Sequence, residues 1–170
     1  MMPKSQKNIR IIGTRGRVDS ADEFIKKAKD FIKEGDVLLQ FLDADKVLGK
    51  EHIYSAIEHA DRAFERGDNI CTTKAMEILI YAAGEPQIAN ALERIGLKDG
   101  CERIAIIAQD DLDIEGLLVH LGLKRDDEVI EFKEQKLMAF GFSEKEISVV
   151  DKSRVKDLIL ERVAMVDVKK

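Results

Sequence analysis

Residues 70–108 read ICTTKAMEILIYAAGEPQIANALERIGLKDGCERIAIIA and form the longest strongly apolar stretch of the 170-residue chain. The pattern predicts a nearly all-apolar helix at 74–83, a break at Gly84-Glu85-Pro86, and a second, amphipathic helix at 87–95. Residues 104–108 are continuously apolar and predict a buried strand. Since no other segment is so apolar for so long, we expect the remaining elements to pack against this one.

The start and faces of these helices are also predicted. Thr72 or Thr73 is expected to cap the first helix, because a threonine hydroxyl accepts a backbone N–H bond at a helix start. In the second helix the inward face is expected to comprise Ile88, Ala91, Leu92 and Ile95.

The flanking sequence predicts further elements on both sides. Strands are expected at 9–14, 37–42 and 129–132, and helices at about 19–34, 50–66, 112–121, 134–147 and, from a Ser153 cap, 153–163. The 37–42 run is almost wholly apolar and predicts a central strand covered on both faces, while Gly35 and Gly67 are expected to end helices. Residues 164–168 alternate and fit either a last strand or a helix. The predicted fold is one mixed α/β domain over 1–170, with a small mixed sheet flanked by about seven or eight helices.

Composition limits the possible functions. The chain has 45% hydrophobic and 36% charged residues and a net charge of −5, which excludes a protein that binds nucleic acid over its whole surface. No apolar run approaches the ~20 residues that span a bilayer, and no signal-like apolar segment follows the N-terminus. Cys71 and Cys101 match no metal or redox spacing, so we expect a reduced, cytoplasmic protein. A local basic patch remains possible at Lys4, Lys7, Arg10, Arg15 and Arg17.

Common catalytic motifs are absent, and one glycine-rich segment is the nearest substitute. Residues Gly13 to Arg17 have backbone amides and two arginines that suit a phosphate, but they lack the lysine–serine pair of a nucleotide loop. A strand-ending turn is the favoured interpretation. The alternative function is a small ligand- or phosphate-binding domain, or an unrecognised enzyme, that uses this turn.

The remaining chemically active side chains favour structural roles. His52 and His59 are seven residues apart, which favours a solvated helix face over a metal site. Cys71 precedes a helix, where its pKa would fall, but no base accompanies it, so a small core residue is the better interpretation. We therefore predict no catalytic residue, no metal site and no cofactor.

Two features predict binding instead. The surplus apolar surface of the 74–83 helix and of residues near 140 suggests a protein partner, unless all of it is core. The candidate partner residues are Met76, Leu79, Leu137, Met138 and Phe140. Lys74, Arg94 and Lys98 lie among small and apolar residues, as in sites for single-stranded RNA.

The quoted stretch also carries a recognisable pattern. It consists of Lys74-Ala75-Met76-Glu77-Ile78-Leu79, Gly84, Gln87-Ile88, Ala91-Leu92, Ile95-Gly96 and Lys98-Asp99-Gly100. This pattern resembles the PRPK-binding protein family, the small non-catalytic subunit of the KEOPS (EKC) complex, in its archaeal form. The resemblance extends over most of the chain, from the first strand to residues 155–168.

The resemblance implies a function. KEOPS installs a threonylcarbamoyl group on the adenosine beside the anticodon of certain tRNAs. The family subunit binds and stimulates the small atypical kinase/ATPase subunit, contacts the other KEOPS subunits only indirectly, and helps recruit tRNA by its single-stranded CCA end. It acts without a membrane and without catalytic residues of its own.

The resemblance also nominates a tRNA-end site. Lys74, Gly84, Gln87 and Ile88 fall on the strongest part of the pattern, and Arg94 and Lys98 complete the set. Gln87 offers donors and acceptors to a base edge, and Ile88 offers an apolar platform. Gly84 and Ile88 also have a purely structural interpretation, as a helix stop and an inward helix position.

Overall fold

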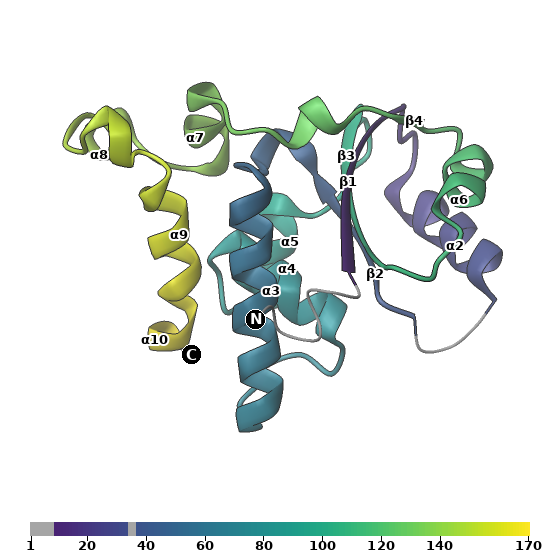
Figure 1. The fold of residues 1–170 in the computed structure, drawn as a ribbon, viewed down its shortest axis with the longest axis horizontal. Helices are drawn as coiled ribbons and strands as arrows, with labels where there is room; N and C mark the ends of the chain where they lie inside the picture. The colour runs from purple at the N-terminus through teal and green to yellow at the C-terminus, as the bar shows by residue number, and fades with distance from the viewer. Residues whose placement is uncertain (1–8, 34–36) are drawn as a thin grey trace.

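The computed structural model describes residues 9–33 and 37–170. Its centre is a four-stranded sheet in the order β2-β3-β1-β4 (Figure 1). The strands are β1 (Ile9–Arg15), β2 (Leu39–Asp43), β3 (Arg103–Gln109) and β4 (Lys124–Arg125). Every pairing is antiparallel, and β1 and β3 form the longest ladder, from Ile9 opposite Gln109 to Arg15 opposite Arg103. The predicted mixed α/β class is confirmed, and the sheet itself is antiparallel throughout.

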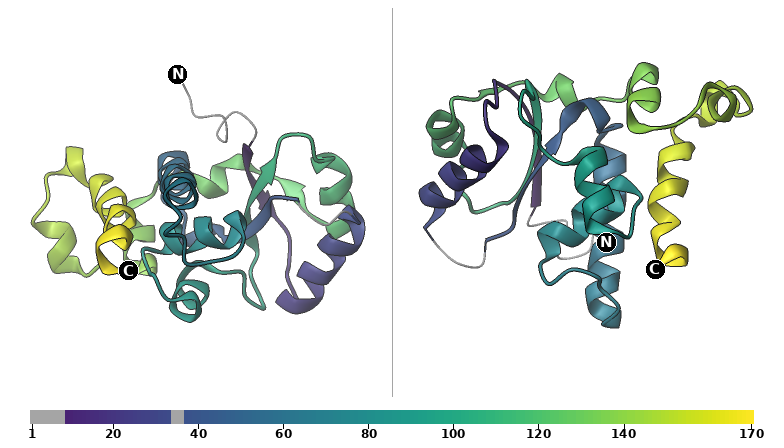
Figure 2. Two further views of the ribbon diagram at one scale, coloured as in Figure 1. Left: turned by 90° about the horizontal axis from the view of Figure 1, so that it is seen from below. Right: turned by 180° about the vertical axis from the view of Figure 1, so that it is seen from behind.

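Helices cover both faces of this sheet (Figures 1 and 2). One face packs on α2 (Ala21–Ile32) and α6 (Ile114–Leu121), and the other packs on α3 (Lys50–Arg66), α4 (Lys74–Ala83) and α5 (Ile88–Ile95). The C-terminal helices lie outside α3: α7 (Glu134–Phe140), α8 (Glu144–Ser148), α9 (Asp157–Ala164) and α10 (Val166–Lys169). Three short 3₁₀ segments lie between the main elements: η1 (Ala44–Lys46) between β2 and α3, η2 (Asp127–Ile130) between β4 and α7, and η3 (Lys152–Arg154) between α8 and α9.

The strand period decides which side chains enter which layer. In β3, Ile104 and Ile106 face the α2–α6 layer, while Ala105 and Ile107 face the α3–α4 layer. Successive side chains of a strand point to opposite faces, so a strand covered on both sides is apolar at every position. The predicted buried strand at 104–108 is confirmed.

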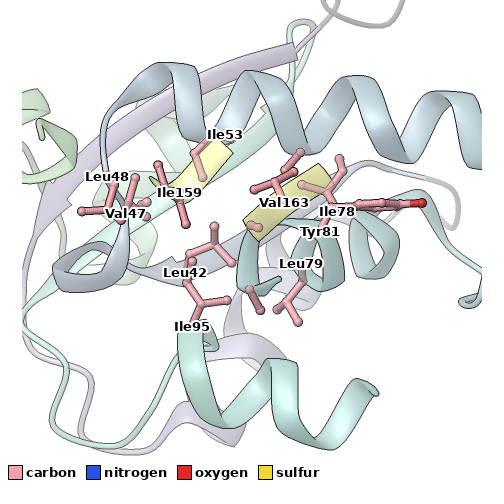
Figure 3. Packing of buried hydrophobic residues seen from close by; sticks show 14 of the residues in the cluster. Leu42, Val47, Leu48, Ile53, Ile78, Leu79, Tyr81, Ile95, Ile159 and Val163 are labelled. Carbon is pink, nitrogen blue, oxygen red and sulfur yellow. The ribbon is translucent and has the colours of Figure 1, made fainter. Parts of the chain in front are cut away.

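Helix α4 is the centre of the larger core. Ile78 to Ala83 are at most 1% exposed, and they pack among α3, α5 and α9 (Figure 3). Thr73 caps the helix by accepting the Met76 N–H at 3.3 Å, as predicted. Of the two interpretations left open for the apolar surface of α4, a partner face or core, the structure supports core, because neighbouring helices surround Ile78 to Ala83.

Three predictions about the elements are corrected, and a fourth lies partly outside the described residues. Within the sheet β2 neighbours only β3, so it is an edge strand and not a central one, although Leu42 also forms an isolated bridge with Gly96. Residues 129–132 form no strand, because Asp126 accepts the Glu128 N–H at 3.2 Å and closes the 3₁₀ turn η2. Helix α2 ends at Ile32 with Lys33 as its left-handed cap, and the expected stop, Gly35, lies outside the described residues. The last part of the chain begins with η3 rather than with a Ser153 cap.

Residues 164–168 are helical apart from the turn at Met165, which separates α9 from α10. In α10, Val166 is buried and Asp167 accepts a hydrogen bond from the Tyr81 hydroxyl and contacts His59 at 3.0 Å. The neighbouring residues Val166 and Asp167 thus both face the α3–α4 layer, whereas in a strand they would point to opposite sides. Across residues 9–33 and 37–170, no helix combines the length and apolarity that crossing a membrane requires.

Candidate functional site

The turn between α4 and α5 is shaped by Gly84. Its φ of 69° is left-handed, and its N–H donates to the Tyr81 carbonyl at 3.0 Å, so the predicted helix stop is confirmed. A Cβ at this position would lie 2.5 Å from Cγ of Arg162, so both the backbone conformation and the space require glycine.

Two arginines support this turn from opposite sides. The Arg94 guanidinium donates to the Ala83 carbonyl at 3.1 Å and pairs with Glu85 at 3.0 Å. The Arg162 side chain packs against Gly84 and pairs with Glu146 at 3.2 Å. The two guanidinium groups stack on Phe140 and Phe142, whose rings stack on one another with centroids 5.6 Å apart. The turn is therefore held by cation–π contacts and ion pairs as well as by its backbone.

The outer face of α5 is apolar and exposed. Ile88 is 41% and Leu92 is 44% exposed, one helical turn apart, while Ala91 and Ile95 are buried. The expected inward positions of Ile88 and Leu92 are corrected, because only one side of this short helix contacts the core. The result is a small apolar platform beside the turn, of the kind on which an unstacked base can lie.

Polar groups accompany the platform. Gln87 precedes α5, and its side-chain oxygen accepts a hydrogen bond from Asn90 at 3.1 Å. Its amide N–H groups donate to no described residue. No described side chain caps the first turn of α5, which leaves backbone N–H donors there for a ligand acceptor. We call Gly84, Gln87, Ile88, Asn90 and Leu92 the turn site.

A surface hollow of about 380 Å³ adjoins the turn site. Its lining includes Lys46, Asn90, Arg94 and Phe140. The acids Glu85 and Glu93 balance the two bases of this lining, so the hollow carries no cationic excess. Binding here would depend on shape, apolar contact and hydrogen bonds more than on charge.

The predicted cations have structural partners. The Lys74 ammonium lies 2.7 Å from Asp61. The backbone of Lys74 is at the far end of α4, about 15 Å from that of Gly84 along the helix axis by the rise of ten residues. Lys98 donates to the Leu92 and Gly96 carbonyls at 3.3 Å each, and burial lowers its pKa. The structure brings Arg94, Gly84, Gln87 and Ile88 together but does not bring Lys74 to them.

The predicted partner residues divide by exposure. Leu79, Leu137 and Phe140 are buried in the core, so a partner cannot reach them in this fold, and Met76 is half-buried against Gln40. Met138 is 53% exposed. Of the eight exposed large apolar side chains in the described residues, four lie on the C-terminal helices or at their ends: Met138, Val149, Met165 and Val168.

Buried polar groups that the sequence did not reveal hold this region together. Glu77 is fully buried and accepts the N–H groups of Ile70 and Cys71, at 3.0 and 2.8 Å. His52, expected on a solvated face, is instead fully buried: Nδ1 accepts the Leu48 N–H at 3.0 Å and Nε2 bonds the Ala82 carbonyl at 2.8 Å. Neither role has a local sequence signal, because the partners are backbone groups of other segments.

Lys136 and Cys71 are also buried. The Lys136 ammonium donates to the Val47, Val129 and Glu131 carbonyls at 2.6–2.9 Å, and burial lowers its pKa to about 8. Burial raises the pKa of the Cys71 thiol to about 11, with repulsion from Glu77 added. The prediction that Cys71 is a small core residue is confirmed.

The Gly13 to Arg17 segment is not a phosphate cradle. Strand β1 runs through Arg15, and the Gly13 N–H donates to the Asp127 carboxylate at 3.0 Å. The Gly16 N–H donates to the Glu102 carbonyl, while Arg15 pairs with Asp126 and Arg17 with Asp19. The expected donors are occupied, so the alternative function loses its site. In residues 9–33 and 37–170, no group of three or more His, Cys, Asp or Glu side chains is arranged for a metal ion.

Comparison with known proteins agrees with the pattern of the 70–108 stretch. The family model described as "Kinase binding protein CGI-121" matches residues 17–167. The Regulatory protein Cgi121 of Methanocaldococcus jannaschii is 33% identical over 135 residues, which are 77% of this chain and 84% of that protein. The chain therefore belongs to the CGI-121 family of kinase-binding proteins.

Proposed function

We propose that this protein is a non-catalytic regulatory subunit of the KEOPS complex. It binds and stimulates the small atypical kinase/ATPase subunit, and it helps recruit tRNA by holding the single-stranded CCA end. The proposal rests on membership of a kinase-binding family, on the regulatory name of the archaeal relative, and on the resemblance of the 74–100 pattern.

The observation that supports RNA binding is the exposed face of α5. Ile88 and Leu92 form an apolar platform, and the Gln87 amide and the uncapped helix start supply hydrogen-bond donors beside it. Unpaired bases are recognised by this combination of an apolar surface and directed polar groups. Arg94 acts by positioning the turn, because its guanidinium is occupied by Ala83, Glu85 and Phe140.

The C-terminal helices supply the proposed kinase face. Val149 is 77% and Val168 is 73% exposed, and Met138 adds a third accessible apolar side chain. Exposed apolar side chains are typical of protein interfaces, and these three lie on the C-terminal helices or at their ends. We assign kinase binding to this layer in place of the buried residues Leu79, Leu137 and Phe140.

Titration into the kinase subunit of the same organism tests the kinase assignment. We expect one-to-one binding with a Kd of about 1 μM or below by calorimetry, and a raised ATPase rate. Val149→Glu should weaken binding about tenfold, because it places a charge in an apolar interface. Val119→Glu is the matched control, since Val119 is 82% exposed on α6, on the other side of the sheet. Absence of binding at tens of micromolar would overturn the kinase proposal.

RNA binding is tested separately with tRNA that has or lacks its CCA end. We expect removal of CCA to abolish most of the affinity, and Ile88→Glu to do the same, with Val119→Glu unchanged. Equal affinity for the two tRNAs would refute the assignment of the turn site.

A further inference from the structure

A second hollow, of about 450 Å³, lies at the end of the β1–β3 ladder. Its lining residues are Arg15, Asp45, Arg103, Glu128, Val129, Lys133, Gln135, Lys136 and Ala139. We call it the sheet-end hollow. Its lining has four basic and two acidic side chains. In three further surface hollows of the described residues, which include the one beside the turn site, acidic side chains equal or outnumber the basic ones. On a chain of net charge −5 this local excess is the reverse of the overall balance.

The strand register concentrates the positive charge. Arg15 lies directly opposite Arg103 on β3, and Lys124 lies directly opposite Arg15 on β4. Residues opposite one another in a ladder share a face of the sheet, and like charges in that position repel. Three bases therefore form a row at the end of the sheet, which we call the basic row.

The acids nearby only partly neutralise this row. Asp126 pairs with Arg15, and Asp45 pairs with Arg103 at 2.6 and 3.0 Å. The Lys124 and Lys133 side chains have no hydrogen bond or ion pair with the described residues, so their charges are free. The Lys136 ammonium gives all its hydrogens to carbonyls and contributes charge without a donor.

The sheet-end hollow adjoins the hollow of the turn site. Ala139 of α7 lines both hollows, and the consecutive η1 residues Asp45 and Lys46 line one each. The sheet-end hollow is thus within reach, across η1, of a strand whose end occupies the turn site. Its phosphates would pass a set of cations that the turn site itself lacks.

We propose that Lys124 and Lys133, beside the paired arginines of the basic row, bind phosphate groups of the RNA strand that leads into the turn site. The inference rests on the proposed function and extends it: the turn site holds the terminal bases, and the sheet-end hollow holds the backbone behind them. A lysine ammonium binds phosphate as a compact point charge with three N–H donors, and the neighbouring arginines add to the positive potential there. A free nucleoside phosphate would offer the same chemistry, so the experiment must separate the two sources.

The experiment compares the trinucleotide CCA with a single-stranded ten-nucleotide RNA that ends in CCA, by calorimetry at two salt concentrations. For the unaltered protein we expect the longer RNA to bind at least about fivefold more tightly and with a steeper salt dependence. The double variant Lys124→Gln with Lys133→Gln should lose this gain in affinity. Its plot of log K against log salt concentration should also be less steep by about 1.4, because each phosphate contact to a single strand contributes roughly 0.7 to the slope. Its affinity for CCA should not change. The control, Lys26→Gln with Lys145→Gln, removes equal charge on α2 and α8 and should behave as the unaltered protein.

The outcomes separate the two proposals. If CCA binds and the longer RNA binds no more tightly, or the double variant keeps the gain, the phosphate site is refuted and the turn site stands. If neither RNA binds, the RNA part of the proposed function is refuted. If inorganic pyrophosphate at about 1 mM displaces the longer RNA from the unaltered protein to the level of CCA, and binds without RNA, the site takes free phosphates and the assignment to RNA is wrong.

Discussion

His52 should make the stability of this protein sensitive to mild acid. The imidazole is fully buried, and burial lowers its pKa from 6.5 to about 4. The hydrogen bonds fix its neutral form, because Nδ1 accepts the Leu48 N–H while Nε2–H donates to the Ala82 carbonyl. A proton on Nδ1 would face another N–H group and break the first bond.

The sign and size follow from linkage. Between pH 6.5 and about 4 the unfolded chain binds a proton at this histidine and the native chain does not, so the free energy of unfolding falls as pH falls. The loss is about 1.4 kcal/mol for each pH unit, which gives about 2 kcal/mol by pH 5 and about 3 kcal/mol by pH 4. Carboxylates with lowered pKa, such as Asp45 and Asp167, titrate below this range.

Urea denaturation at about pH 7.5 and pH 5 measures the effect. His52→Gln should be less stable at pH 7.5, and its loss on acidification should be about 2 kcal/mol smaller than that of the unaltered protein. His120→Gln is the control, since it removes a histidine that is exposed on α6. Equal pH dependence in the unaltered protein and His52→Gln would refute the reasoning.

Three further predictions concern the scaffold. Glu77→Ala should lower the free energy of unfolding by about 3 kcal/mol, because the N–H groups of Ile70 and Cys71 lose a buried carboxyl acceptor. Cys71 should also react faster with a thiol reagent, and an unchanged thiol rate would contradict this. Gly13→Ala should cost about 2 kcal/mol in urea, since its Cβ would lie 2.5 Å from the Asp126 carbonyl, and a neutral effect would contradict the close approach. Arg162→Ala should weaken CCA binding about fivefold while the chain remains folded, because the support of Gly84 is lost, and unchanged affinity would show that the turn holds without it.

Local sequence signals predicted α4 well because single residues with specific chemistry set both of its ends. A threonine cap and a left-handed glycine define the two ends, and both act within a few residues. The end of α3 is set in the same way, by the left-handed Gly67, as expected. Elements with such signals can be placed from the sequence alone.

The position of a strand in the sheet, and the side of a helix that meets the core, could not be predicted in this way. The apolar run at 37–42 has the composition of a central strand, yet β2 lies at the edge of the sheet, where helices and a bridge from Leu42 to Gly96 cover it. In α5 four apolar positions suggest one inward face, but only Ala91 and Ile95 meet the core. Which side of an element is covered depends on segments far away in the chain.

The recognisable pattern and the candidate site therefore have different physical roles. Glu77, Ile78 and Leu79, the centre of the pattern, are fully buried and hold α4 and the loop before it. The exposed groups that suit a base are Ile88 and the Gln87 amide, at the start of the next helix. A substitution at Glu77 should reduce RNA binding only as far as it unfolds the protein, whereas Ile88→Glu should reduce binding with the urea midpoint unchanged. If both lowered the midpoint and affinity in proportion, α5 would be scaffold as well, and the base contact would have to lie elsewhere on the surface.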